Sequence, residues 1–235
     1  MALILNIETS TEVCSVALAK DGKIISHRED TKGLNHAKLL APFIDEIIKE
    51  AGITSKELDA VAVSIGPGSY TGLRIGVSMT KGLCFGISKP AIAVPTLQPL
   101  AKVVATKLQR DALYCPMIDA KRMEVYTALF NKDNKEILET SAKIITEDSF
   151  KEYLEKEKII FFGNGSKKVK NLISSSNAEF LDDILPSADY MVAISEKMYN
   201  DQEFVDIAYF EPKYLKNFIT TLPKQSIIEK AMNDN

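Results

Sequence analysis

Short apolar runs alternate with helical patterns along the first half of the chain. Five runs rich in small and β-branched residues predict strands, and Asp21-Gly22 between the second and third predicts a tight hairpin turn. These strands are residues 2–7, 13–20, 23–29, 60–65 and 90–94. Apolar residues at helical spacing, preceded by capping residues, predict helices over 35–51 and 71–87 and a third that begins after Thr96.

The second half repeats this order of elements. Its predicted strands are residues 113–119, 124–130, 142–145, 158–162 and 178–181, and its predicted helices are 147–157, 165–173 and 187–200. Both halves therefore read βββαβαβα, which predicts two α/β lobes, each a mixed sheet flanked by helices. We place the first lobe at 1–97 and the second at 98–215, and expect the tail 216–235 to pack back on the first lobe.

The helix over 35–51 has an apolar face that is wider than one core needs. Beside its core stripe lie His36, Leu39 and Phe43. A broad core face and a surface for a partner explain this width equally well.

The helix over 71–87 contains four glycines and few charges. An interior glycine costs ~0.5–1 kcal/mol relative to alanine, so the pairs Gly72/Gly76 and Gly82/Gly86 imply a packing or functional reason. Residues four apart lie on one helix face and let another backbone approach closely. The most polar stripe of this helix is formed by Arg74, Ser78, Lys81 and Phe85.

Three loops carry residues that suit a phosphate group. Residues 6–11 place a carboxylate and hydroxyls after the first strand, although satisfying turn amides is the simpler explanation. Residues 66–72 (GPGSYTG) precede a helix, whose first amides attract anions. Pro67 donates no hydrogen bond and no P-loop lysine follows, so an anion site and a plain turn are equally supported. Residues 163–165 form a weaker counterpart.

Charge and residue inventory narrow the function. Lys+Arg 29 against Asp+Glu 32 give a net charge of −3, which disfavours strong unaided binding of nucleic acid. Three cysteines without a Cys-x-x-Cys pair indicate reduced thiols in a cytosolic protein. Two distant histidines nearly exclude a zinc site, while a carboxylate Mg²⁺ site stays open. No stretch approaches the ~18 apolar residues of a membrane span.

Several motifs resemble those of one family. Residues 4–18 (ILNIETSTEVCSVAL) look like the opening of the TsaB (YeaZ) family, and residues 66–76 (GPGSYTGLRIG) resemble its most specific signature. Residues 119–126 (DAKRMEVY), 163–165 (GNG) and 212–216 (PKYLK) are similar to its weaker later motifs. The resemblance covers nearly the whole chain and is densest over 1–97.

The resemblance implies a fold of two ribonuclease-H-like lobes, as in actin, the sugar kinases and the heat-shock chaperone ATPases. It also implies a role in making N6-threonylcarbamoyladenosine on tRNA. In that system the relative TsaD transfers the threonylcarbamoyl group, and the ATPase TsaE joins the assembly. Chains like this one are implied to be the non-catalytic partner of TsaD, a homodimer when TsaD is absent, with tRNA bound only through the complex. A cytoplasmic location is implied, and no intrinsic cofactor. A nucleotide at a subunit interface stays open.

One difference from TsaD supports the non-catalytic interpretation. TsaD carries a His-x-x-x-His metal motif after the strand that corresponds to 90–94, whereas residues 94–100 here read VPTLQPL. An ATP-dependent small-molecule kinase that uses Glu8 and the glycine loops is the alternative, although the chain leaves little room for a sugar site. A peptidase of the M22 type is disfavoured because zinc ligands and a paired nucleophile and base are missing.

The predicted site is an interface between proteins, formed by the two helices of the first lobe. The expected contact residues are His36, Leu39, Phe43, Gly72, Arg74, Gly76, Ser78, Lys81 and Phe85. No catalytic, cofactor-binding or metal-binding residue is predicted.

Overall fold

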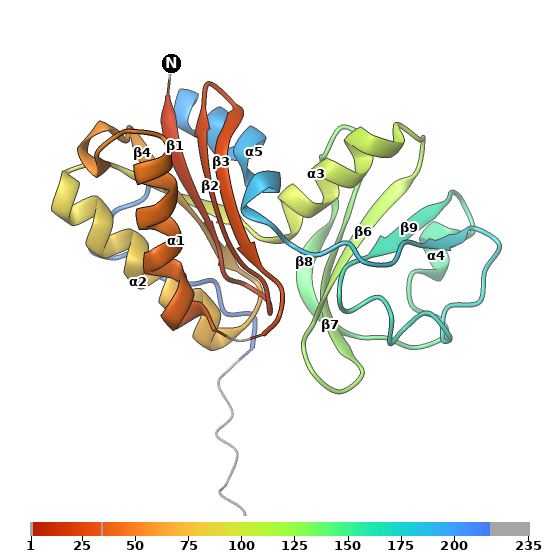
Figure 1. Cartoon of the computed structure of the whole chain (residues 1–235). Coiled ribbons are helices and arrows are strands. Elements are labelled where there is room, and N and C mark those ends of the chain that lie inside the picture. Colours follow the sequence, from red (N-terminus) through yellow and green to blue (C-terminus); the bar gives the residue numbers. More distant parts are fainter. Residues whose placement is uncertain (1, 34, 217–235) are drawn as a thin grey trace, which may run out of the picture.

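Two lobes lie side by side in the computed structural model, which describes residues 2–33 and 35–216 (Figure 1). Each lobe has a five-stranded mixed sheet, and the strand orders are β3-β2-β1-β4-β5 and β10-β9-β6-β7-β8. The first three strands of each sheet pair antiparallel, and the remaining two add in parallel. The two sheets therefore share one topology, which confirms the repeated strand pattern predicted from the sequence.

The first lobe forms from the N-terminal elements. Its strands are β1 (Leu3–Glu8), β2 (Cys14–Lys20), β3 (Lys23–Asp30), β4 (Ala60–Gly66) and β5 (Ala91–Pro95). Helices α1 (His36–Glu50) and α2 (Tyr70–Ile87) cover one face, and a short 3-10 helix η1 (Ser55–Glu57) precedes β4. Side chains alternate between the faces of a strand, so Leu5 and Ile7 pack under α1 and α2 while Ile4 points to the opposite face.

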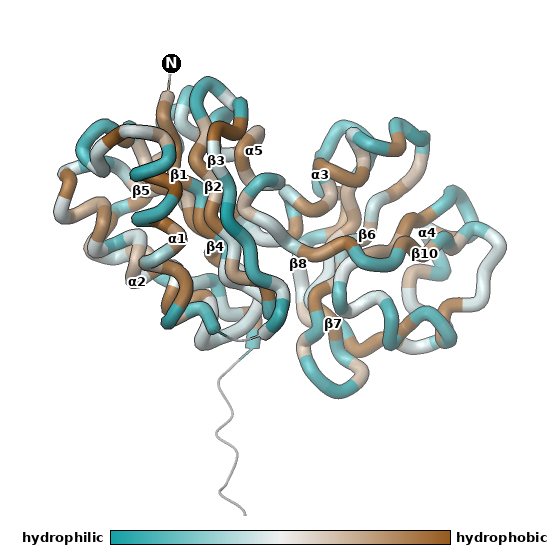
Figure 2. The backbone as a smooth tube through the Cα atoms, in the orientation of Figure 1, coloured by the Kyte–Doolittle hydropathy of each residue, from teal (hydrophilic) through white to brown (hydrophobic). Residues whose placement is uncertain are grey.

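The second lobe begins with α3 (Leu97–Leu108), which lies between the two sheets. Its strands are β6 (Leu113–Asp119), β7 (Glu124–Phe130), β8 (Glu136–Ile144), β9 (Ile159–Phe162) and β10 (Ala178–Phe180). Helix α3 packs on one face of this sheet, against Tyr114, Ile160 and Phe162. The tube view shows the apolar strands of both lobes enclosed by more polar surface elements (Figure 2).

Two helices predicted in the second lobe are absent or short. Helix α4 covers only Lys151–Leu154 instead of 147–157, and residues 165–173 form turns rather than a helix. Phe150 has a left-handed backbone (φ 66°) and packs edge-on against Phe161, so the chain turns inward before α4 begins. The anchoring of a buried aromatic side chain therefore outweighs the charged helical pattern of 147–157.

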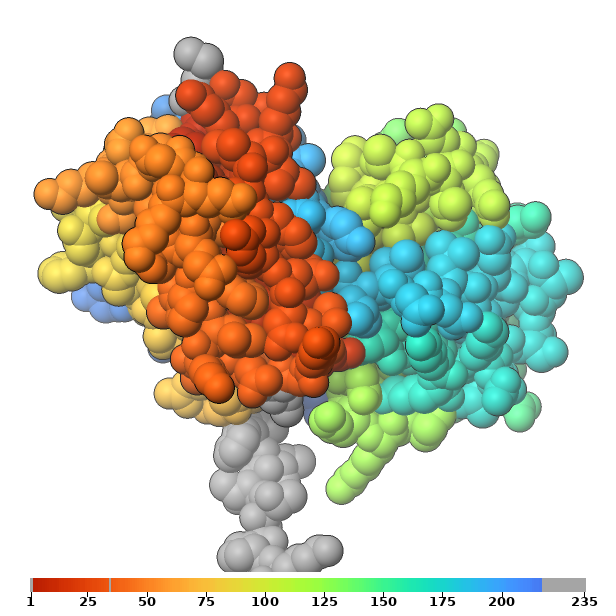
Figure 3. Space-filling view, viewed as in Figure 1, coloured from red at the N-terminus to blue at the C-terminus, as the bar shows by residue number. Residues whose placement is uncertain are grey.

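Helix α5 (Ala188–Asn200) returns to the first lobe. Met191 and Ile194 pack on the face of the first sheet opposite α1 and α2, and Ser195 Oγ donates to Asn6 Oδ1 at 2.6 Å. These residues fall within the predicted second lobe, 98–215, but they pack on the first sheet. In the space-filling view the atoms of α5 lie where the two lobes meet (Figure 3).

The predicted packing of the tail falls almost wholly on residues outside those described. Lys216, the one residue of it that the structure describes, contacts the second lobe. Within the described ranges, no helix combines the length and the apolarity needed to cross a membrane.

Candidate functional site

The Glu8 carboxylate, which the sequence suggested as a ligand for a metal–phosphate complex, is hydrogen-bonded within the first lobe. Glu8 is buried, and its Oε1 accepts from Ser10 N at 2.6 Å and from Ser64 Oγ at 2.9 Å. Desolvation by burial raises the pKa of Glu8, although the hydrogen bonds from Ser10 and Ser64 oppose the rise. Glu8 thus serves the internal structure of its loop.

The glycine-rich loop between β4 and α2 lies directly on that first loop. Ser69 N donates to Ser10 O at 2.6 Å, and a Cβ added at Gly68 would stand 2.3 Å from the same oxygen. A Cβ at Gly72 would stand 2.1 Å from Thr9 O, and one at Gly76 2.4 Å from Thr9 Oγ1. The two loops are therefore packed against each other at these positions.

These contacts correct part of the predicted interface. Gly72 and Gly76 are buried because they let α2 approach the backbone of its own lobe, not that of a partner. His36 is also buried, 3% exposed, with its Nε2 3.1 Å from Val13 O. These three residues are covered in the folded chain and are not available to a partner.

The remaining predicted residues divide between the core and the surface. Leu39 and Phe43 are half-buried and pack against the core of the first lobe. The Lys81 ammonium donates to Ala208 O at 3.2 Å and lies 4.9 Å from the centre of the Phe210 ring, so it is engaged within the chain. These contacts leave the outer surface of α2 as the exposed part of the predicted interface.

Arg74, Ser78 and Phe85 lie on that outer surface. The Phe85 side chain is 83% exposed, which is unusual for a large apolar residue. A Cβ at Gly82 or Gly86 would have no neighbour within 4 Å, so this side of α2 is open.

An open groove of about 920 Å³ runs along α2 and is bordered by Ala37 of α1. Its floor is apolar, and Arg74 Nη1 donates to the hydroxyl of Tyr70 at 2.7 Å on its rim. The lining residues are Ala37, Tyr70, Thr71, Arg74, Ile75, Ser78, Met79, Gly82 and Leu83. We call the groove together with Phe85 and Gly86 the α1/α2 face.

The later sequence motifs meet the first ones at the end of the molecule where β1 and β6 finish. Asn164 Nδ2 donates to Glu12 Oε2 at 2.8 Å, and Asn164 Oδ1 accepts from Asp119 N at 2.9 Å. Burial tends to raise the pKa of Asp119, but the Lys168 ammonium and the Lys121 amide outweigh it and lower the pKa. Residues far apart in sequence thus form one network across both lobes.

The cysteines show no sign of reactivity. All three are free and buried, and burial raises the pKa of Cys14 and Cys84 to about 11 and that of Cys115 to about 12. A thiolate is therefore scarce near neutral pH. In the part of the chain that the structure describes, no cluster of three His, Cys, Asp or Glu side chains is arranged to hold a metal ion.

A polar cluster that the sequence did not predict lies where α5 begins. Ser15 Oγ lies 3.2 Å from His27 Nε2, and His27 Nδ1 lies 3.6 Å from Asp189 Oδ2. Ser187 Oγ donates to Glu29 Oε2 at 2.6 Å. The order of serine, histidine and carboxylate resembles a hydrolase triad.

Burial argues against a nucleophilic role for this cluster. Ser15 is fully buried, and its Oγ accepts the N–H of Ala188 at 3.1 Å. A nucleophile needs access to its substrate, so the cluster instead fastens the first turn of α5 to the first lobe. The only sequence signal was polar residues on two strands predicted to pair.

The chain is similar to known proteins in both sequence and structure. The family model of TsaD, tRNA N6-adenosine threonylcarbamoyltransferase, matches residues 29–223. The tRNA threonylcarbamoyladenosine biosynthesis protein TsaB of Escherichia coli (strain K12) is 31% identical over 220 residues, which are 91% of this chain and 94% of that protein. The chain belongs to the TsaB (YeaZ) family. This confirms the family inferred from the sequence motifs.

Solved structures agree with the TsaB family assignment. YeaZ from Pseudomonas aeruginosa superposes with a TM-score of 0.79 at 28% identity, over 92% of this chain and all of that one. The activator of 2-hydroxyisocaproyl-CoA dehydratase from Clostridium difficile, with bound ADPNP, gives a TM-score of 0.50 at 7% identity, over 86% of this chain and 96% of that one. The second likeness shows the fold alone, and the predicted two-lobe, ribonuclease-H-like fold is confirmed.

Proposed function

We propose that this chain takes part in tRNA threonylcarbamoyladenosine biosynthesis as a non-catalytic partner of TsaD, and that the α1/α2 face is the surface that binds TsaD. The observation that carries the proposal is the open outer side of α2, where an almost fully exposed Phe85 stands beside two glycines with free space above them. Exposed apolar surface of this kind favours a protein partner.

The relationship to TsaD supports the choice of partner. The TsaD family model matches this chain across the whole of α1 and α2, so TsaD is expected to have equivalent helices. Two related helix pairs suit packing in a four-helix arrangement. A second copy of this chain offers the same surface, so the proposal includes a homodimer when TsaD is absent.

The non-catalytic role rests on the residue inventory. Residues 94–100 contain no histidine where TsaD is implied to carry its metal motif, and Glu8 is engaged within its own loop. With a net charge of −3, the isolated chain is expected to bind tRNA with a Kd of only ~10⁻⁴–10⁻⁶ M at physiological salt. We therefore assign tRNA binding, and the association with TsaE, to the complex.

Calorimetric titration of the cognate TsaD tests the interface. The double variant Phe85→Ala with Gly82→Trp removes an aromatic anchor and fills the space above α2, while tryptophan in a helix costs less than glycine. Loss of a central anchor costs ~2 kcal/mol or more, so we expect affinity to fall at least ~30-fold. Circular dichroism checks that the double variant is folded.

The matched control is Ile144→Ala, which shortens an apolar residue that is 67% exposed on β8 of the other lobe. It should bind TsaD as the wild type does. Unchanged affinity of the double variant would show that the α1/α2 face is not the interface. Sustained ATP turnover by the isolated chain would favour the kinase alternative.

A further inference from the structure

The chain that follows α5 crosses the first lobe. Val205 N donates to Ala91 O at 3.0 Å, which adds an antiparallel bridge at the outer edge of β5. Farther on, Lys213 N donates to Ile65 O at 2.7 Å, and the ring of Tyr214 lies 4.7 Å from that of Tyr70. This segment is therefore attached to the first lobe at two strands and one helix.

Two residues later the chain reaches the second lobe. The Lys216 ammonium donates to Ala120 O at 3.1 Å and pairs with the Glu124 carboxylate. The Lys216 side chain is 34% exposed and that of Glu124 is 22% exposed, so water screens this pair only in part. Residues 205–216 thus span both lobes, and we call them the strap.

A second tie lies at the same end of the molecule. Asn164 on the second lobe donates to Glu12 on the first, and its amide oxygen is fixed by Asp119 N. The carboxamide is therefore held in one orientation from its own lobe before it reaches across. Lys216 and Asn164 are the two latches of this end.

The covalent chain crosses between the lobes at two other places. Only Thr96 separates β5 from α3, and the first turn of α5 is fastened to the first lobe through Ser187 and Ser15. Two bodies joined by chain crossings alone can rotate about them as a hinge. Side-chain contacts that also bridge the two bodies must break before such a rotation.

We propose that Lys216 and Asn164 lock the two lobes at one fixed angle, so that this chain does not open and close in response to a nucleotide. Each latch is partly exposed and weak by itself, and their effect depends on acting together. The proposal concerns the chain alone and does not depend on its partner.

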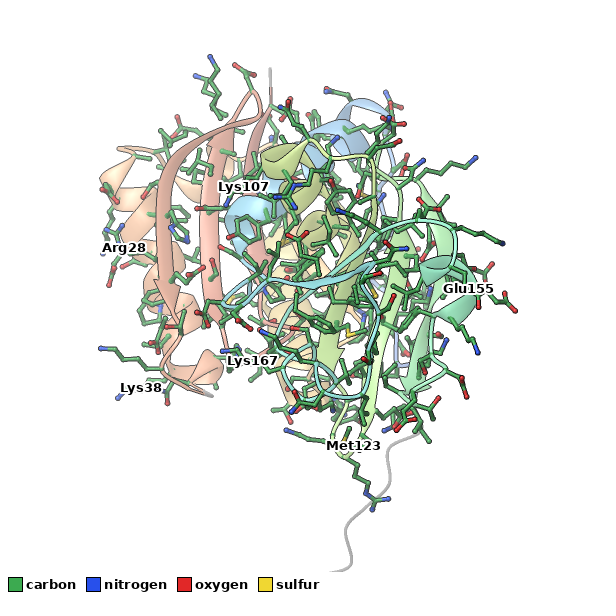
Figure 4. The ribbon with its side chains drawn as sticks, turned by 90° about the vertical axis from the view of Figure 1, so that its right-hand side faces the viewer. Arg28, Lys38, Lys107, Met123, Glu155 and Lys167 are labelled. Atoms are coloured by element: carbon green, nitrogen blue, oxygen red, sulfur yellow. The ribbon has the colours of Figure 1, made fainter. Side chains whose placement is uncertain are left out.

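Distance measurements between paired spin labels test the lock. Lys38 and Glu155 point away from the molecule on opposite lobes, so Lys38→Cys and Glu155→Cys are suitable labelling positions (Figure 4). The three native cysteines are buried and react slowly. In the otherwise wild-type chain we expect one narrow distance distribution, unchanged when Mg·ATP is added.

The double variant Lys216→Ala with Asn164→Ala removes both latches. Its distribution should broaden and shift to longer distances, while circular dichroism and thermal unfolding confirm that the lobes stay folded. The matched control, Lys213→Ala with Lys167→Ala, removes one lysine from the strap and one from the second lobe. Lys213 uses only its backbone in the strap, and Lys167 pairs with Asp183 within its own lobe, so the control should stay narrow.

Either of two results would overturn the lock. A broad wild-type distribution, or one that Mg·ATP shifts, would show that the lobes move despite the latches. A double variant as narrow as the wild type would show that other contacts fix the angle.

Discussion

Residues of one type have opposite roles on the two sides of α2. Gly72 and Gly76 face Thr9 with no room for a methyl group, whereas Gly82 and Gly86 face open space. The sequence predicts that glycines are needed in this helix but cannot say which contact needs them, because Thr9 is more than sixty residues away from Gly72 in the chain. By spacing alone, the pairs Gly72/Gly76 and Gly82/Gly86 cannot be told apart.

Alanine at each position separates the two roles. Gly72→Ala places a Cβ 2.1 Å from a backbone oxygen, so it should lower the free energy of unfolding by about 1–3 kcal/mol, as overpacking does. Gly82→Ala meets nothing and should raise it by about 0.4–1 kcal/mol, because the unfolded chain loses freedom. Urea unfolding followed by circular dichroism measures both, and equal effects would contradict the assignment.

His27 should make stability depend on pH. The Glu29 carboxylate, whose Oε2 lies 3.6 Å from His27 Nε2, is the largest cause that raises the pKa of His27; the charge of Asp189 adds to it, and desolvation opposes it. The charged ring favours the folded state, so its contribution is complete below the ordinary value of 6.5 and is lost as pH rises through the raised pKa. The same contact lowers the pKa of Glu29, so both charges are present between pH 4.5 and 6.5.

Comparison of His27→Gln with the wild type measures this contribution. The wild type should be more stable at pH 5.5 by about 1 kcal/mol or less, since the groups are half-exposed, and the difference should shrink at pH 8.5. Proton NMR should show the His27 ring titrating above its ordinary value. A difference that grows with pH would have the wrong sign.

At the scale of elements, strands and helices were predictable where the local pattern decides them, whereas β8 extends over Glu136–Ile144 instead of the predicted 142–145. The bounds of β6 and β7 match the predicted 113–119 and 124–130, because apolar alternation between turn residues depends only on the local sequence. The helices of the second lobe were wrong where a tertiary anchor decided the backbone. Lys168, for example, donates to Arg122 O and Glu124 O, which holds its segment in turns against the sheet.

Strand pairing shows why the polar cluster under α5 escaped prediction. The turn at 21–22 sets Lys20 opposite Lys23, and that register continued along the strands would place Ser15 opposite Arg28. An irregularity between Leu18 and Ala19 shifts the pairing by one residue and places Ser15 opposite Glu29. No local sequence pattern indicates this shift in strand pairing. Arg74, Ser78 and Phe85, in contrast, are exposed on α2, and their contact with a partner stays a prediction.

Helix α5 makes a prediction about fragments. Residues 1–97 alone contain every strand of the first sheet, yet Ile4, Ile92 and Val94 would lose their cover from α5. We expect this fragment to self-associate and to bind a hydrophobic dye that the full chain does not bind. Light scattering and dye fluorescence, with the full chain as control, measure both. A fragment that stays monomeric and does not raise the fluorescence of the dye would show that the first lobe does not need α5 as cover.

At the scale of the whole molecule, two copies of one sheet topology have diverged in how they are covered. The first sheet has long helices on both faces, and one of them is borrowed from the far end of the chain. The second has α3 on one face and mainly irregular chain on the other. The lobe whose sheet is covered on both faces also presents the α1/α2 face. The proposed partner surface therefore lies on the more completely packed lobe.

Because α5 lies late in the chain, the second face of the first sheet is covered late during synthesis. The first lobe has all its strands once Pro95 has been made, but the helix that covers its second face ends at Asn200. At ~5–20 residues per second, the ribosome needs about 5–20 s to add the intervening stretch. Throughout that interval an apolar sheet face remains open on the nascent chain. Until α5 leaves the exit tunnel, this face lacks the cover that it has in the folded chain.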